Sequence, residues 1–164
     1  MSLTVKITAP IFEKLSDLKE EYGFNELGLA VSGGSDSLAM LYICNDWAQK
    51  NKVKLHCLTV DHKLRSESAK EAELVANHCS GLGINHEIVE WKHEGNISGN
   101  LSDSARSARY KLIDKWRKEL SFVLVGHTKN DQIETFFMNL KRGSGIEGLK
   151  GMPLSFKRPE GYFI

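Results

Sequence analysis

The sequence contains little cysteine and no cysteine pair at metal-binding spacing. Its three cysteines, Cys44, Cys57 and Cys79, are odd in number, far apart and not arranged as CxxC. Disulfide frameworks and zinc knuckles depend on even or closely paired cysteines. We therefore expect three buried free thiols rather than a domain stabilised by disulfides or zinc.

Long hydrophobic runs and an excess of charge of one sign are also absent. Lys6, Glu13, Lys14 and Asp17 interrupt the apolar positions near the start, so neither a signal peptide nor a membrane span is expected there. A formal net charge of +1 neither requires nor excludes a nucleic-acid partner, because phosphate binding depends on local basic density. These features favour a cytoplasmic protein that is not bound to a membrane.

The chain does have the length and composition of one compact domain. Hydrophobic residues make up 41% and charged residues 26% of the 164 positions, which is ordinary for a globular domain. A chain of this length can bury a sizeable core without disulfides. No repeat or proline-rich linker divides it before the glycine-rich segment 143–151, so we expect one domain over residues 1–164.

Strand-like and helix-like segments alternate along the chain. Apolar runs predict strands over 27–31, 53–60, 84–91 and 122–126. Helical spacing and end signals predict helices over 10–22, 38–48, 68–82 and 101–120. Parallel strands need long crossover connections, which helices provide. The predicted fold class is therefore α/β, with a parallel sheet flanked by helices on both faces.

The turn after the first predicted strand has the composition of a phosphate-binding loop. Residues 32–37 read SGGSDS and join a strand to a helix, where free backbone N–H groups and the helix dipole favour an anion. Gly33 and Gly34 allow close approach of the backbone. The loop lacks the lysine of GxxxxGK[ST] and does not read GxGxxG, so neither the Walker nor the dinucleotide-binding interpretation is supported.

The polar side chains of this loop suggest a nucleotide with a metal ion. Hydroxyl donors come from Ser32, Ser35 and Ser37. Asp36 beside phosphate needs a divalent cation between the two negative groups, which indicates magnesium. From the residues alone, a Gly-Gly turn in which Ser35 or Asp36 caps the following helix explains the pattern equally well.

Two further polar segments follow predicted strands, and in a parallel sheet they meet the first at one edge. Asp61 and His62 follow the second strand, and the segment 127–131 follows the last. His62 and His127 can bind adenine or phosphate, although a lone histidine is more often a structural polar residue. The other carboxylates here are Asp131 and Glu134, which fit a capping box and can also hold magnesium or accept a proton.

The loop resembles the PP-loop of the ATP pyrophosphatase superfamily, whose members cleave ATP between its α- and β-phosphates and transfer AMP. This resemblance implies a Rossmann-like, adenine nucleotide alpha-hydrolase-like fold. It also implies that the loop binds ATP through Ser32, Gly33, Gly34, Ser35, Asp36 and Ser37.

The segment 126–153 resembles the DDQxET...RGSGxxGLxGM signature of the tRNA(Ile)-lysidine synthetase family. The matching residues are Asp131, Gln132, Glu134, Thr135, Arg142, Gly143, Gly145, Gly148, Leu149, Gly151 and Met152. Further matches are the segment from Asp61 to Ser68 and the ARxxRY motif at 105–110. Asn130 and Ser102 depart from the family pattern, and Asn130 carries no charge and cannot act as a base. The resemblance extends over roughly residues 25 to 160.

This family resemblance implies ATP-dependent ligation of free lysine to C2 of the wobble cytidine of tRNA(Ile) with a CAU anticodon. Pyrophosphate leaves as the tRNA is adenylated, and AMP leaves when the lysine amine attacks. The implied catalytic residues are Asp36, Asp131 and Glu134, with Asp36 and Asp131 as magnesium ligands. His62 and His127 would join the loop in binding ATP. The residues implied to bind tRNA or the adenylate are Arg65, Arg106, Arg109 and Arg142.

Other interpretations stay open at the level of sequence. A tRNA thiolase usually needs paired cysteines, which are absent here, and a small-molecule amide ligase is a further alternative within the superfamily. The chain can also be a fragment that binds ATP or tRNA without catalysis, since family members commonly continue into tRNA-binding domains that we do not recognise here. The resemblance also allows a homodimer. For each basic residue, a solvated surface position is as good an interpretation as phosphate binding.

Overall fold

The computed structural model describes residues 3–63, 68–92, 101–126, 133, 137, 140–141, 143 and 156–164. Its helices are α1 (Leu3–Tyr22), α2 (Ser35–Asn51), α3 (Ser68–Leu82) and α4 (Leu101–Arg117). Its strands are β1 (Glu26–Ala30), β2 (Lys54–Asp61), β3 (Asn85–Glu90), β4 (Phe122–Val125), β5 (Phe156–Arg158) and β6 (Gly161–Phe163). The predictions made for Arg65, His127, Asn130, Asp131, Glu134 and Arg142 lie outside the described residues.

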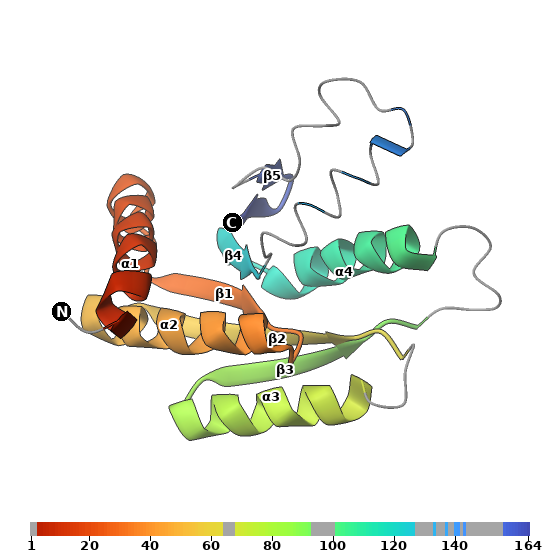
Figure 1. Cartoon of the computed structure of the whole chain (residues 1–164), viewed down its shortest axis with the longest axis horizontal. Helices are drawn as coiled ribbons and strands as arrows, with labels where there is room; N and C mark the ends of the chain where they lie inside the picture. Colours follow the sequence, from red (N-terminus) through yellow and green to blue (C-terminus); the bar gives the residue numbers. More distant parts are fainter. Residues whose placement is uncertain are drawn as a thin grey trace.

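The strands form one sheet in the order β3-β2-β1-β4-β6-β5. All neighbouring pairs are parallel except β5 and β6, which form an antiparallel pair at the edge. Figure 1 shows the strands linked by the helices that the crossover argument requires. The predicted α/β class with a mainly parallel sheet is confirmed.

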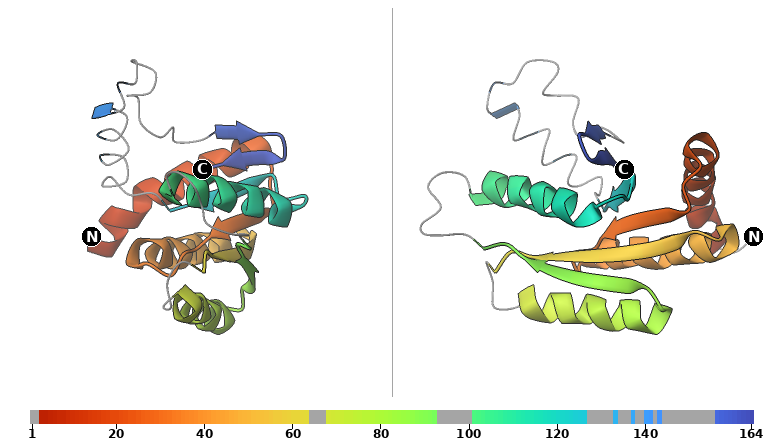
Figure 2. Two further views of the ribbon diagram at one scale, coloured as in Figure 1. Left: turned by 90° about the vertical axis from the view of Figure 1, so that its right-hand side faces the viewer. Right: turned by 180° about the vertical axis from the view of Figure 1, so that it is seen from behind.

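Two hydrophobic clusters cover the two faces of the sheet. The larger cluster joins α1, α2 and α3 to β1 and β2, with Trp47 and Leu41 fully buried. The smaller one joins α4 to the other face through Tyr110, Ile113 and Trp116. Figure 2 shows α4 on one side of the sheet and α2 with α3 on the other. Both faces of the central strands β1 and β4 are therefore covered, as expected for parallel strands, while the edge strand β3 stays more exposed.

Some predicted boundaries are wrong. The first helix begins at Leu3 rather than near Pro10, which lies inside α1. An interior proline removes one helical hydrogen bond and its ring crowds the carbonyl four residues earlier, so the sequence favoured a start near Pro10, yet α1 continues through it. The fourth helix ends at Arg117 rather than residue 120. The strands β5 and β6 were not predicted, because three residues are too few for an alternating pattern to show.

The expectation of free thiols is confirmed. Cys44, Cys57 and Cys79 are all buried and none is in a disulfide. Burial raises the pKa of the Cys44 thiol to about 12, so this side chain behaves as a small apolar residue. In the part of the chain that the structure describes, no helix combines the length and the hydropathy required to cross a bilayer.

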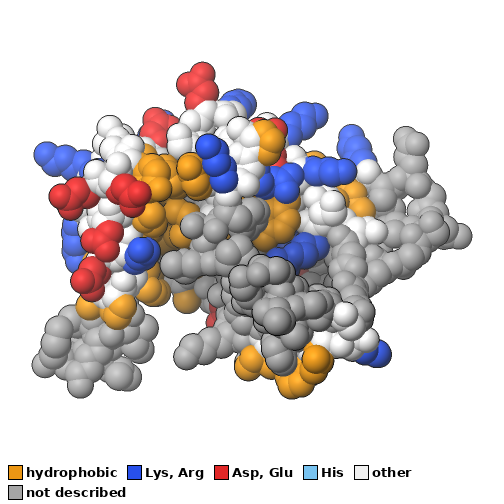
Figure 3. Space-filling view, turned by 90° about the horizontal axis from the view of Figure 1, so that it is seen from above, with side chains coloured by type: hydrophobic (Ala, Val, Ile, Leu, Met, Phe, Trp, Pro, Cys, Tyr) orange, Lys and Arg blue, Asp and Glu red, His pale blue; other side chains and the backbone are white. Residues whose placement is uncertain are grey.

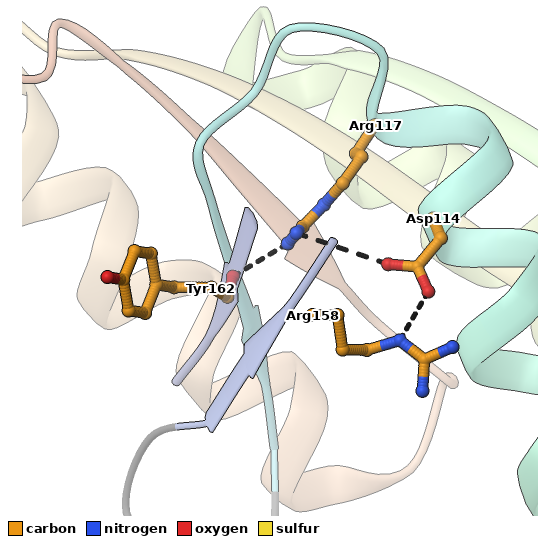
Figure 4. A network of polar contacts seen from close by, with 4 residues as sticks. All are labelled: Asp114, Arg117, Arg158 and Tyr162. Atoms are coloured by element: carbon orange, nitrogen blue, oxygen red, sulfur yellow. Dashed lines mark hydrogen bonds and ion pairs between the residues drawn. The ribbon is translucent and has the colours of Figure 1, made fainter. Parts of the chain in front are cut away.

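A buried arginine connects α4 to the β5–β6 hairpin. The side chain of Arg117 is 0% exposed, donates a hydrogen bond of 2.6 Å to the carbonyl oxygen of Tyr162, and lies over the Phe163 ring. Asp114 lies 4.0 Å from Arg117 Nη1 and also pairs with Arg158 (Figure 4). Burial lowers the pKa of Arg117, and the Asp114 carboxylate opposes that shift. The ion pairs thus hold the hairpin against the end of α4.

Replacing Asp114 with alanine is expected to lower the free energy of unfolding by about 3 kcal/mol, because the buried Arg117 charge would lose its carboxylate partner. Urea unfolding followed by circular dichroism measures this change. Glu119→Ala is the control, since Glu119 is exposed and its loss is expected to change stability by less than about 0.5 kcal/mol. Equal stabilities of the two variants would contradict this role for Asp114.

Candidate nucleotide-binding site

A cavity of about 340 Å³ lies at the carboxyl ends of β1, β2 and β4. Its lining comes from the ends of three strands, the residues that follow them, and the helices α2, α3 and α4: Ala30, Val31, Ser32, Gly34, Ser37, Leu58, Thr59, Val60, His62, Ser68, Glu71, Arg109, Val125 and Gly126. The lining is mostly apolar along the strands, and most of its polar side chains come from the loops and helices. The predicted convergence of polar segments at this edge is thus observed for the first two segments, and Gly126 leads into the third.

The loop between β1 and α2 presents a helix N-terminus to the cavity. Gly34 is the N-cap of α2, and no side chain caps the helix, so the alternative role of Ser35 or Asp36 as a cap is wrong. The first helical hydrogen bond runs from Leu38 N to Gly34 O. The N–H groups of residues 34–37 therefore precede the first intrahelical donor. Such N–H groups and the helix dipole favour an anion at this position.

Ser37 gives the loop its shape. Its side chain is buried, and its hydroxyl donates to Gly34 O at 2.9 Å. Ser37 Oγ in turn accepts a hydrogen bond from Ser32 N at 3.2 Å, and the Ser32 hydroxyl also lies 3.2 Å from Ser37 Oγ. Because the hydroxyl proton of Ser37 is used inside the loop, we expect Ser37 to offer an anion its backbone N–H rather than its side chain.

The two glycines of the loop serve different purposes. Gly33 has φ +91°, and a Cβ built there would lie 3.0 Å from the carbonyl oxygen of Glu71 on α3. Gly34 has φ −69°, and a Cβ there would meet only Ser32 Oγ at 3.8 Å. Gly33 is thus required by the fold, whereas Gly34 has room for a methyl group and lines the cavity.

Gly33→Ala is expected to lower the free energy of unfolding by about 1–3 kcal/mol through backbone strain. Gly34→Ala is expected to change stability by less than about 1 kcal/mol, and to weaken ATP binding by about tenfold because the methyl occupies space that a phosphate needs. Thermal unfolding and isothermal titration with ATP measure both effects. Wild-type ATP affinity in a folded Gly34→Ala protein would contradict the assignment of the loop.

Asp61 is the last residue of β2, and His62 follows it at the cavity. The buried Asp61 carboxylate accepts a hydrogen bond of 2.8 Å from Lys63 N, and Lys63 has φ +53°. Burial alone would raise the pKa of Asp61, but hydrogen bonds from Ser68 and Lys63 and the Lys63 charge bring it below its usual value. Asp61 is therefore an ionised structural residue that fixes the turn, and His62 faces the cavity from that turn.

His62 lies against the Trp91 ring, with the ring centroids 5.7 Å apart. Its Nδ1 atom is buried and has no hydrogen-bond partner among the described residues. Burial lowers the pKa of His62, and the Arg109 charge lowers it further, while Asp61 opposes the shift. The imidazole is therefore neutral at pH 7, so it can accept or donate a hydrogen bond but supplies no charge for a phosphate.

The depressed histidine pKa predicts how stability varies with pH. The unfolded chain binds a proton at His62 near pH 6.5 while the folded chain does not, so stability is full above that pH and falls as the pH drops below it. Asp61 affects the pH dependence of stability only below about pH 4, where its carboxyl would protonate in the unfolded chain. Between pH 7.5 and 5.5 the free energy of unfolding should therefore fall less steeply for His62→Gln than for the wild type. An equal or steeper fall in the variant would contradict this assignment.

The structure separates the two arginines that the sequence places on one face of α4. Arg109 lines the cavity, whereas the Arg106 guanidinium lies 5.6 Å from the centre of the Tyr110 ring. Two further basic residues, Lys157 and Arg158, have other partners, since Lys157 lies over the Tyr162 ring and Arg158 pairs with Asp114. Arg109 is therefore the described arginine that can reach a ligand in the cavity.

Asp36 lies in the first turn of α2 and is exposed, beside the cavity rather than in its lining. Among the described residues, no group of three or more His, Cys, Asp or Glu side chains can hold a metal ion. Magnesium in nucleotide sites is commonly held by one or two carboxylates together with phosphate oxygens and water. A single carboxylate at this helix start fits that arrangement.

Sequence reasoning missed several residues of the cavity. Thr59 and Glu71 both line it, and neither was among the candidate site residues, while Ser68, which also lines it, was named only as the end of the family-like segment 61–68. Thr59 lies two residues before the end of a buried strand, where a polar residue in an apolar run was a usable signal. Glu71 reaches the cavity because its backbone packs against Gly33.

These features define an α/β domain with a cavity at the carboxyl edge of a parallel sheet and a helix N-terminus suited to an anion, an arrangement typical of nucleotide-binding domains. Residues 7–162 match the family described as the PP-loop domain. The chain belongs to the PP-loop family.

Curated relatives show which PP-loop proteins the chain is similar to. The chain is 46% identical over 132 residues to the tRNA(Ile)-lysidine synthase of Wolbachia pipientis wMel. The matched region covers 78% of this chain and 30% of that protein. It is 47% identical over 128 residues to the tRNA(Ile)-lysidine synthase of Ruegeria pomeroyi, covering 77% of this chain and 30% of that protein. The chain thus spans about 30% of the length of these relatives.

Solved structures share the fold. A U34-tRNA thiolase from Methanococcus maripaludis with its [4Fe-4S] cluster gives a TM-score of 0.66 at 22% identity, covering 76% of this chain and 46% of the other. An NH3-dependent NAD synthetase from Campylobacter jejuni gives a TM-score of 0.61 at 18% identity, covering 80% and 59%. Identities this low support the architecture and not the chemistry.

Proposed function

We propose that this chain is the single PP-loop catalytic domain of a cytoplasmic enzyme that ligates lysine to C2 of the wobble cytidine of tRNA(Ile) with a CAU anticodon. ATP adenylates the cytidine with release of pyrophosphate, and the lysine amine then displaces AMP. The observation that carries the proposal is a helix N-terminus aimed at a cavity with Arg109 in its lining, in a chain that is 46% identical to a tRNA(Ile)-lysidine synthase.

The reaction needs activation because the oxygen at C2 of cytosine is a poor leaving group. Attack of that oxygen on the α-phosphate forms an adenylate and breaks the bond to the β-phosphate. The N–H groups of residues 34–37 and the positive end of α2 would hold the phosphates while charge builds on the departing pyrophosphate. The apolar strand ends, among them Ala30 and Val125, would exclude water from the adenine side of the cavity.

Asp36 would supply a carboxylate ligand to a magnesium ion at the loop, with Asp131 as a second ligand. When bound, magnesium neutralises charge on the pyrophosphate leaving group. Asp131 or Glu134 would accept the proton of the attacking lysine amine, since an ammonium group cannot act as a nucleophile. His62 and His127 would contact ATP, and the neutral His62 would do so through a hydrogen bond.

The tRNA would approach over the α4 side of the molecule. Figure 3 views the molecule from above relative to Figure 1. On this face lysine and arginine side chains are spread over the α4 half, and acidic side chains are gathered over α1. Arg109 would contact the adenylate from inside the cavity, while Arg106, Arg65 and Arg142 would contact the RNA. Such contacts make binding weaken with salt, because each neutralised phosphate releases counterions.

Mass spectrometry of the tRNA tests the proposal. The chain is incubated with tRNA(Ile) bearing a CAU anticodon, ATP, magnesium and lysine, and the tRNA is digested and weighed. A cytidine that gains lysine less water supports the proposal. Replacement of oxygen by sulfur when a sulfur donor is added would indicate a thiolase instead. If the tRNA is unchanged although the protein binds ATP, the chain is a binding module rather than an enzyme.

The buried cysteines weigh against the thiolase alternative. Cys44, Cys57 and Cys79 lie in the core, and none lines the cavity. A sulfur-transferring thiol must reach the activated nucleotide, and these side chains do not. The lysine ligation therefore fits the cavity better.

A further inference from the structure

A hydrogen-bonded chain of three groups runs from the strand β3 to the cavity. The hydroxyl of Thr59 on β2 lies 2.8 Å from the carbonyl oxygen of Val31 and 2.9 Å from His86 Nε2. Thr59 is 2% exposed and lines the cavity, whereas His86 belongs to β3 and does not. Val31 is the last residue before the loop that begins at Ser32.

We propose that His86 is a positioning residue that acts through Thr59 to fix the end of β1, and so sets the phosphate-binding loop relative to the cavity. The inference rests on the ATP-binding part of the function proposed above. It concerns a residue outside the cavity lining, and it makes a statement about the proton on His86 that can be measured without ATP.

The positions of the protons follow from the donors and acceptors present. The carbonyl oxygen of Val31 can only accept, so Thr59 must donate its single hydroxyl proton there. The Thr59 oxygen must then accept from His86, which places a proton on His86 Nε2. Burial lowers the pKa of His86, with Glu87 opposing the shift, so the ring is the neutral Nε2–H tautomer at pH 7.

This chain of bonds acts where β1 gives way to the loop. The N–H of Val31 donates to Leu58 O at 2.9 Å, and its carbonyl receives the Thr59 hydroxyl, so the peptide groups on both sides of Val31 are bound to β2. The next residue, Ser32, donates its N–H to Ser37 Oγ. A shift of Val31 would therefore move the start of the loop, which includes Ser32 and Gly34 in the cavity lining.

Nitrogen-15 NMR of the imidazole rings in the nucleotide-free protein tests the proton assignment. The neutral Nε2–H tautomer of His86 is expected, and an Nδ1–H tautomer would overturn the proposal. Amide signals of residues 32–37 should shift in Thr59→Val and keep their wild-type positions in Thr59→Ser. Unchanged loop amides in a folded Thr59→Val protein would also overturn it.

Titration with ATP tests the effect on binding. Thr59→Val is expected to weaken ATP binding by about tenfold and His86→Met by about threefold, while Thr59→Ser and His86→Gln, which retain a hydroxyl and an Nε2 donor, stay near the wild type. The double variant Thr59→Val with His86→Met should bind as Thr59→Val does, because His86 acts only through Thr59. Fully additive losses, or wild-type affinity in His86→Met, would contradict the proposal. Absence of ATP binding to the wild type would instead refute the proposed function, leaving the NMR result to decide the role of His86.

Discussion

Asp36→Ala is expected to reduce tRNA-dependent AMP release by at least about 100-fold, because the pyrophosphate would leave without the carboxylate that holds its magnesium ion. Asp36 is exposed in the first turn of α2, so its loss should lower stability by less than about 1 kcal/mol. Thin-layer separation of labelled AMP from ATP measures the rate.

The matched control for this change is Asp46→Ala. Asp46 is another exposed aspartate of α2, and it lies away from the helix start. Its replacement removes the same charge from the same helix and should leave AMP release unchanged. Raising the magnesium concentration should restore part of the activity of Asp36→Ala if the carboxylate acts through the metal. Wild-type turnover by Asp36→Ala would refute its catalytic role.

Arg109→Ala is expected to reduce AMP release by about 100-fold, a loss typical of removing one group that stabilises charge in the transition state. Arg109 lines the cavity, and its positive charge acts on other groups there, since this charge lowers the pKa of His62. Arg109→Lys keeps the charge but loses the planar fork of donors, so an intermediate rate is expected.

Lys111→Ala provides the comparison on the same helix, because Lys111 is exposed and lies outside the cavity lining. Single-turnover assays with saturating tRNA separate loss of catalysis from weaker RNA binding. A slow Arg109→Ala reaction that recovers fully at high tRNA concentration would assign Arg109 to the RNA rather than to the adenylate.

The fold was readily predicted because its signals are local and repeated. Each buried strand is a short apolar run, and each helix carries an apolar stripe at helical spacing, so the alternation of β1 to β4 with helices was readable. The loop between β1 and α2 could be located for the same reason, since SGGSDS lies between one strand and one helix.

The remaining features depend on contacts between distant residues. The positive φ of Gly33 follows from packing against Glu71, which is far along the chain. Arg106 and Arg109 are equally good candidates in the sequence, and only the packing of α4 puts Arg109 at the cavity and Arg106 on Tyr110. The Asp114 and Arg117 pair was likewise missed, because it forms only once β6 lies against α4.

A crystal structure with magnesium and an ATP analogue that resists cleavage between the α- and β-phosphates tests the central claim most directly. We expect the phosphates at the N–H groups of residues 34–37, with the metal ion between them and Asp36. A nucleotide bound elsewhere, or a loop that stays empty at saturating analogue, would contradict the assignment of this cavity to ATP.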